Sequence, residues 1–175
     1  MKTYKQFLEM AVTEKRQTYD YGCAMVYFEA PELLELHKEI DSEDVHENGI
    51  ETEPHTTLLY GLHSDDIPEE DVLKICKEAN YEPIKLDNIS LFTNPEFDVL
   101  KFDAHSEVLH KVNSELTKLP HTTDYPDYHP HATIAYLKPG KGKDYVKKFK
   151  DKTILVKPKE IVYSKADGNK IIRKL

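Results

Sequence analysis

Cysteine pairs, long apolar runs and an excess of positive charge are all missing from this sequence. The two cysteines, Cys23 and Cys76, each lie inside an apolar segment. Buried free thiols are therefore expected, not a disulfide framework or a cysteine-based metal site. No apolar run approaches the roughly 18 residues that a membrane helix requires. The opening Met-Lys-Thr-Tyr-Lys-Gln has no apolar core of a signal peptide, so we expect a soluble cytoplasmic protein without a membrane partner.

The charge balance excludes one common class of ligand. The formal net charge is −8, which disfavours binding to long nucleic acid, because such binding depends on clustered lysine and arginine side chains. A small phosphodiester held in a local pocket stays compatible with this charge. With 175 residues, of which 39% are hydrophobic, the chain is long enough for one compact domain or for two small lobes that share a core.

Hydrophobic periodicity predicts an alternation of helices and strands along the whole chain. The segment 41–53 is polar and acidic and is expected to be an exposed loop, and 121–130 is expected to be a rigid aromatic loop. Pro158 is expected to interrupt a strand. The predicted helices are 3–17, 31–40, 68–79 and 105–119, with a short basic helix or loop at 141–150; the predicted strands are 23–28, 55–62, the hairpin 84–92 with 97–103, 131–137, 153–156, 161–163 and 171–172.

One short pattern occurs twice. Residues 55–60 read His-Thr-Thr-Leu-Leu-Tyr and residues 131–136 read His-Ala-Thr-Ile-Ala-Tyr, so both copies follow His-x-Thr-apolar-x-Tyr. Because successive side chains of a strand alternate between its faces, the histidine and threonine of each copy should share one face. The apolar residue and the tyrosine should then anchor the strand from the opposite face.

The candidate catalytic residues are His55, Thr57, His131 and Thr133. If the two strands lie side by side, the site contains two imidazoles and two hydroxyls, with no acidic residue in the motif. Two histidines with pKa values near neutrality can act as general base and general acid in one turnover. Threonine hydroxyls can donate hydrogen bonds to the non-bridging oxygens of a phosphate. The motif therefore predicts chemistry at a phosphate ester.

The paired motifs, one in each half of the chain, resemble the two-histidine (2H) phosphoesterase superfamily. The context from Tyr125 to Thr133, Tyr-Pro-Asp-Tyr-His-Pro-His-Ala-Thr, is similar to that of phage anti-CBASS enzymes, which degrade the cyclic oligonucleotide messengers of bacterial immunity. The resemblance covers roughly residues 22–163. It implies one α+β domain over residues 1–175, with two lobes that are each an antiparallel sheet backed by helices and are related by a pseudo-two-fold axis. It also implies a monomer without a cofactor, acting in the host bacterial cytoplasm if the gene is carried by a phage.

The resemblance further implies metal-independent cleavage of 3′–5′ phosphodiesters in a cyclic di- or oligonucleotide such as 3′,3′-cyclic GMP-AMP. One histidine would take the proton of a ribose 2′-hydroxyl, which attacks the adjacent phosphorus. The other would protonate the departing 5′-oxygen and leave a 2′,3′-cyclic phosphate. The sequence leaves open which histidine takes which role.

Five further residues are candidates for holding the substrate. Two aromatic residues are expected to stack on bases, two tyrosines belong to the aromatic loop before the second motif, and one late acidic residue matches a base-reading position of relatives. Each also has an ordinary structural alternative, in the core or on the surface. These residues are Tyr21 and Phe92, Tyr125 and Tyr128, and Glu160.

Four other interpretations remain open at the level of sequence. A 2H enzyme that opens 2′,3′-cyclic phosphates on RNA ends or on nucleotide derivatives would use the same four catalytic residues. A protein that only sequesters a cyclic nucleotide would return its ligand unchanged. A metal site built on His129 and His131, with His121 and Asp127 nearby, is a third possibility. The last is a coincidental match of two unrelated strands.

Overall fold

The computed structural model describes residues 18–175, and the helix predicted over 3–17 lies outside them. Across the described residues the chain forms eight strands, four α-helices and one short 3-10 helix. The helices are α2 (Pro31–His37), η1 (Ser42–Asp44), α3 (Glu69–Glu78), α4 (Glu107–Leu116) and α5 (Gly142–Phe149). The strands are β1 (Gly22–Glu29), β2 (Val45–Ile50), β3 (His55–Leu62), β4 (Ile84–Thr93), β5 (Asp98–His105), β6 (His131–Leu137), β7 (Ile154–Ser164) and β8 (Lys170–Lys174).

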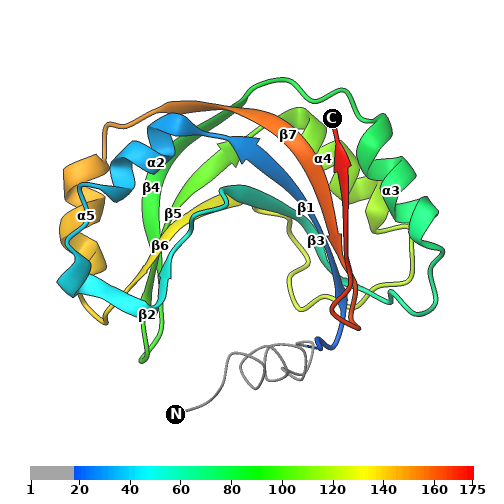
Figure 1. Cartoon of the computed structure of the whole chain (residues 1–175), viewed down its shortest axis with the longest axis horizontal. Helices are drawn as coiled ribbons and strands as arrows, with labels where there is room; N and C mark the ends of the chain where they lie inside the picture. Colours follow the sequence, from blue (N-terminus) through cyan, green and yellow to red (C-terminus); the bar gives the residue numbers. More distant parts are fainter. Residues whose placement is uncertain (1–17) are drawn as a thin grey trace, which may run out of the picture.

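The strands form two curved lobes that meet along one long strand. Their order is β2-β6-β5-β4-β7-β1-β3, with β8 also paired to β7, and every pairing is antiparallel. The first part of β7 pairs with β4, and the rest pairs with β1 and β8. The whole has the shape of an arch with its helices on the outside (Figure 1). Helices α2 and α5 pack on the lobe that contains β4, β5 and β6, and α3 and α4 pack on the lobe that contains β1, β3 and the second part of β7. This arrangement confirms the predicted α+β class.

The apolar stripes read from the sequence become the buried faces of the helices. Helix α3 buries Val72, Leu73 and Cys76, which recur at helical spacing on one side. Cys23 and Cys76 are both free thiols, as predicted. Burial raises the pKa of Cys23 to about 11 and that of Cys76 to about 12, so both are protonated at neutral pH. Within residues 18–175, no helix is long and apolar enough to cross a membrane.

Two of the secondary-structure predictions are wrong for identifiable reasons. The segment 41–53 is not simply a loop, because it contains η1 and the edge strand β2, which pairs with β6 at Val45 and Ile50. Backbone pairing at an exposed edge requires few apolar side chains, so acidic and polar residues concealed this strand. Helix α4 starts at Glu107 and not at residue 105, because His105 ends β5 and its Nε2 contacts Asp87 Oδ1 at 2.5 Å.

Pro158 does not divide β7, which runs without a break from Ile154 to Ser164. Pro158 lies opposite Phe28, next to a shift in the register between β1 and β7. A β-bulge leaves one residue unpaired, so a proline can be accommodated there although it lacks an N–H group.

Candidate active site

The first motif strand begins and ends at the predicted residues, but its side chains are distributed differently. Its histidine, threonine and tyrosine pair with alternate residues of β1: His55 with Tyr27, Thr57 with Met25, and Tyr60 with Cys23. These three β1 residues belong to one packed cluster on one face, and residues paired across strands share a face. The expectation that Tyr60 lies behind the strand is therefore wrong. A β-bulge at Leu58 inserts one residue and reverses the alternation.

The second motif strand repeats this geometry. His131, Thr133 and Tyr136 pair with Asp103, Lys101 and Val99, three alternate residues of β5. The register shifts by one residue after Thr133, at Ile134. Tyr136 therefore also shares the face of its histidine and threonine, contrary to prediction. Each copy of the motif presents an imidazole, an aliphatic hydroxyl and a phenol on the same side.

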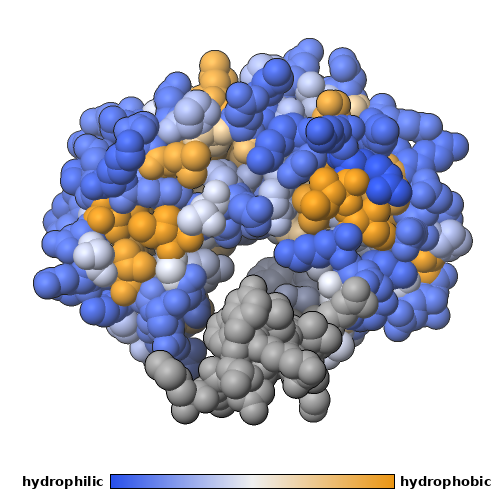
Figure 2. All heavy atoms as spheres, in the orientation of Figure 1, coloured by the Kyte–Doolittle hydropathy of each residue, from blue (hydrophilic) through white to orange (hydrophobic). Residues whose placement is uncertain are grey.

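The four predicted catalytic residues are brought together, because β3 and β6 run beside each other in the middle of the arch. Thr56 Oγ1 donates to the carbonyl of His131 at 3.0 Å, and the Tyr128 hydroxyl donates to the carbonyl of Thr57 at 2.8 Å. The charge of His55 acts on His131 and contributes to the lowering of its pKa. The surface is hollowed between the two lobes, with apolar side chains on either side of the hollow (Figure 2).

Both imidazoles are oriented by the same backbone contact. His55 Nδ1 lies 2.8 Å from the carbonyl of Glu53, and His131 Nδ1 lies 3.1 Å from the carbonyl of His129, in each case two residues upstream. A proton on Nδ1 satisfies this carbonyl and leaves Nε2 to exchange protons with a ligand. The shared contact thus selects the same tautomer in both motifs.

His131 has a group of neighbours that sequence reasoning missed. Lys101 is a buried lysine whose Nζ lies 3.0 Å from Ser90 Oγ and 3.1 Å from Asp103 Oδ1. Burial lowers the pKa of His131, the carbonyl of His129 and the charge of Asp103 oppose this, and Lys101 and His55 add to it. The only available signal was that Lys101 and Asp103 alternate with apolar residues, which is also the pattern of an ordinary half-exposed strand.

His55 lies among different groups. Its ring stacks on that of Tyr27, with centroids 4.9 Å apart and planes inclined by 19°. The pKa of Tyr27 is raised to about 12, first by burial and then by the charges of Glu53, Glu51, Cys23 and Glu160. Carboxylates thus act on the residue beside the first motif, and Glu51 acts on Tyr136 of the second motif as well. The second motif also has a buried lysine beside it.

The predicted substrate-binding residues are distributed unevenly around this groove. Phe92 is 49% exposed, and its ring meets that of His131 at 83° with centroids 5.2 Å apart. Glu160 pairs with Tyr27, on the face of the motif. Tyr125 is 81% exposed in the loop before β6. Tyr128 is half-buried and uses its hydroxyl to hold β3. Tyr21 stacks on His63, which follows the C-terminal end of β3, whereas His55 is at the N-terminal end of that strand. The binding roles of these five residues remain predictions.

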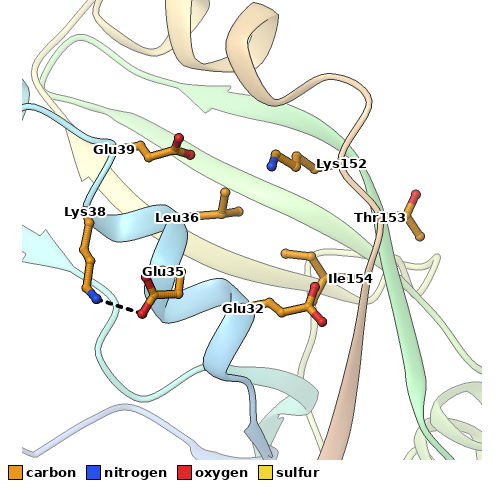
Figure 3. Close-up of a pocket in the computed structure, with 8 residues that line it drawn as sticks. All are labelled: Glu32, Glu35, Leu36, Lys38, Glu39, Lys152, Thr153 and Ile154. Carbon is orange, nitrogen blue, oxygen red and sulfur yellow. Dashed lines mark hydrogen bonds and ion pairs between the residues drawn. The ribbon is translucent and has the colours of Figure 1, made fainter.

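Two cavities of the described residues lie away from the motif residues. One, of about 410 Å³, lies between α2 and the start of β7 and is lined by Leu36, Ile154 and charged residues (Figure 3). The other, of about 370 Å³, is lined by Tyr21, His63 and several aspartates. No group of three or more histidine, cysteine or acidic side chains in the described part of the chain is arranged to hold a metal ion.

An arch of two antiparallel lobes, each contributing one His-x-Thr strand to a common groove, defines the class of 2H phosphoesterases. Among solved structures, the chain is similar to Usb1 from Kluyveromyces marxianus, with 8% identity, a TM-score of 0.55, and coverage of 90% of this chain and 99% of Usb1. This likeness is one of fold. E. coli LigT complexed with 3′-AMP also matches, with 16% identity, a TM-score of 0.45, and coverage of 89% of this chain and 96% of LigT. No curated protein matches the chain.

The model of the family described as anti-CBASS protein Acb1 matches residues 70–167, which is more than half of the sequence. The chain belongs to this family and is a phosphodiesterase. The second motif lies inside the matched residues, whereas the first lies upstream of them. The assignment of His55 and Thr57 to the site therefore depends on the geometry of β3 beside β6.

Proposed function

We propose that this protein cleaves the 3′–5′ phosphodiester bonds of cyclic di- or oligonucleotide messengers and thereby counteracts host CBASS immunity from within the bacterial cytoplasm. The observation that carries the proposal is that two His-x-Thr strands from different lobes line one groove. The two strands are joined by the hydrogen bond from the Thr56 hydroxyl to the backbone carbonyl of His131. Membership of the anti-CBASS family supports an immune messenger as the substrate.

The reaction proceeds in two steps that use the same groups. In the first, one histidine Nε2 takes the proton of a ribose 2′-hydroxyl, and the 2′-oxygen forms a bond to the adjacent phosphorus. The bond from phosphorus to the 5′-oxygen breaks, and the second histidine protonates that oxygen. In the second step the proton transfers reverse and water opens the resulting 2′,3′-cyclic phosphate to a 3′-phosphate. Thr57 and Thr133 stabilise the phosphoryl oxygens, on which negative charge accumulates.

The groove around these groups suits a nucleotide ring. Phe92 presents an exposed ring next to His131, where a base can stack. Glu160 stands across β1 from His55, where a carboxylate can accept hydrogen bonds from a base. The placement of both residues beside the histidines supports the predicted binding roles.

The test uses the purified full chain in EDTA with three substrates: 3′,3′-cyclic GMP-AMP, a linear RNA, and an oligonucleotide that ends in a 2′,3′-cyclic phosphate. Hydrolysis of the cyclic dinucleotide, lost in both His55→Ala and His131→Ala, is the expected result. Turnover of the terminal cyclic phosphate alone would replace the proposal with an RNA-end phosphodiesterase. Return of an intact but bound dinucleotide would indicate a sequestering protein. Loss of all activity in EDTA would indicate metal catalysis.

A further inference from the structure

A lysine is buried in the floor of the groove and is not explained by packing. The side chain of Lys101 is almost enclosed, with a relative exposure of 8%. Its Nζ donates to Ser90 and Asp103 and lies 4.6 Å from the centroid of the Phe92 ring. Two of the three N–H donors of the ammonium group are thus used by Ser90 and Asp103, and the group also lies over the Phe92 ring. Lys101 is therefore suited to act through its charge, without contacting a substrate directly.

The charge of Lys101 is directed at one of the two histidines. Lys101 pairs with Thr133, and its neighbour Asp103 pairs with His131, so these groups share one small area of the sheet. Asp103 also accepts a hydrogen bond from Asn88 at 2.6 Å. Burial raises the pKa of Asp103, but the Asn88 and Lys101 contacts outweigh it and lower the pKa overall. The carboxylate is thus ionised and largely compensated, which leaves the lysine as the stronger influence on His131.

The charged groups that act on His131 come from two strands. Lys101 and Asp103 belong to β5, and His55 belongs to β3; Phe92, from β4, is uncharged. Lys101 and His55 favour the neutral imidazole, whereas Asp103 favours the protonated one. On the other side of the groove, Tyr27 stacks on His55, and after burial the charges of Glu53, Glu51 and Glu160 raise its pKa. Because the charge of Glu51 acts on Tyr136 of the second motif as well, the buried lysine beside His131 is what distinguishes the two halves of the motif.

We infer that Lys101 is a positioning residue that makes His131 the proton acceptor of the first step and leaves His55 as the proton donor. The part of this inference that concerns proton transfer to and from the substrate rests on the proposed function. The effect of Lys101 on the pKa of His131 does not. His131 Nε2 takes the 2′-hydroxyl proton as the bond from the 2′-oxygen to phosphorus forms. The proton on His55 Nε2 passes to the 5′-oxygen as its bond to phosphorus breaks. The two histidines then exchange protonation states.

The first experiment needs no substrate. The pKa of His131 is measured by NMR titration of the imidazole signals in the wild-type protein and in Lys101→Met, Lys101→Arg and Asp103→Asn, with the signal assigned from His131→Gln. Lys101→Met should raise the pKa of His131 by about one unit, because a cation is lost and Asp103 loses its partner. Lys101→Arg keeps the charge and should restore the wild-type value. Asp103→Asn should lower the pKa of His131 further.

Asp103→Asn also keeps the test decisive if Lys101→Met fails to fold. An unchanged or raised pKa of His131 in Asp103→Asn would contradict the electrostatic assignment. An unchanged pKa in a folded Lys101→Met variant would do the same. Neither result depends on whether cyclic dinucleotides are substrates.

The second experiment assigns the proton donor. A cyclic dinucleotide with sulfur in place of the bridging 5′-oxygen has a leaving group that needs no protonation. His55→Ala should therefore recover activity on this substrate relative to the oxygen substrate, whereas His131→Ala should not.

The pH profile gives a further readout. In wild-type protein the acid limb of kcat/KM against pH should report His131, and in Lys101→Met it should move to higher pH by the amount found by NMR. Recovery in His131→Ala, or a Lys101→Met variant with a raised KM and an unmoved pH profile, would overturn the inference. If wild-type protein cleaves neither substrate, the proposed function fails and takes the assignment of roles with it, while the titration still decides the effect of Lys101 on His131.

Discussion

The two motif strands, β3 and β6, have the same sequence pattern, the same bulge after the threonine and the same carbonyl contact to Nδ1. What differs is the strand next to each. Beside β3, Tyr27 stacks on the histidine among acidic residues, and beside β6, Lys101 and Asp103 flank the other histidine. The comparison teaches that the repeated motif supplies equivalent atoms, and that the neighbouring strands place those atoms in different surroundings.

Removing either imidazole should have the largest effect. His55→Ala and His131→Ala should each lower kcat by roughly 10²–10⁴, the usual contribution of a positioned acid or base. The double variant should lose little more than either single one, because the two groups act in one concerted step. Single-turnover assays on the cyclic dinucleotide measure this. His46→Ala, in the edge strand β2, is the matched control and should keep its activity. Additive losses would indicate that the histidines act independently.

The hydroxyls should matter next. Thr57→Val and Thr133→Val keep the branched shape but remove a donor to the phosphoryl oxygens, and each should lower kcat by about 10²–10³. The Thr57 hydroxyl also interacts with the Cys23 side chain and lowers its pKa, so Thr133→Val should be the more damaging of the two. Steady-state kinetics separate kcat from KM. A change confined to KM would show that the hydroxyls bind the ground state and the transition state equally.

The glycine after the first motif tyrosine should give an effect on stability. Gly61 follows Tyr60 with φ of +114°, and a Cβ there would lie 1.9 Å from the carbonyl oxygen of Thr122. Gly61→Ala should therefore cost more than the roughly 1–3 kcal/mol of backbone strain alone. Gly140→Ala is the control, because Gly140 has φ of +81° and nothing within 4 Å of its Cβ position. Equal losses in urea unfolding would show that the Thr122 loop moves away freely.

The smallest effects should come from the two hydrogen bonds between the lobes. Thr56→Val removes the donor to the His131 carbonyl, and Tyr128→Phe removes the donor to the Thr57 carbonyl. Each should lower the free energy of unfolding by about 1 kcal/mol, or roughly 2–4 °C in Tm for a chain of this size. Because both carbonyls belong to motif strands, kcat should also fall a few-fold. Calorimetry and kinetics on the same samples check both. An unchanged Tm together with an unchanged kcat would show that neither bond holds the strands in place.

Much of the architecture was predictable because periodicity and turn residues agree along most of the chain. The strand His55–Leu62 was predicted at its observed bounds, and the paired motif indicated the residues that share the groove. The face of Tyr60 and of Tyr136 was not predictable, because a bulge depends on the register of the partner strand and leaves no mark in the motif. Lys101 was missed for a related reason: its burial depends on Ser90 and Phe92 on the adjacent strand β4.

Strand β7 pairs with β4 over its first residues and with β1 over the rest, so a single stretch of backbone belongs to both halves of the arch. A motion that separated the two halves of the arch would break the backbone hydrogen bonds between β7 and its neighbours β4 and β1. The spacing between His55 and His131 is therefore built in during folding and does not await the arrival of a ligand. A phosphodiester substrate would therefore meet two histidines that the fold has already aligned, so binding need not supply the free energy to align them.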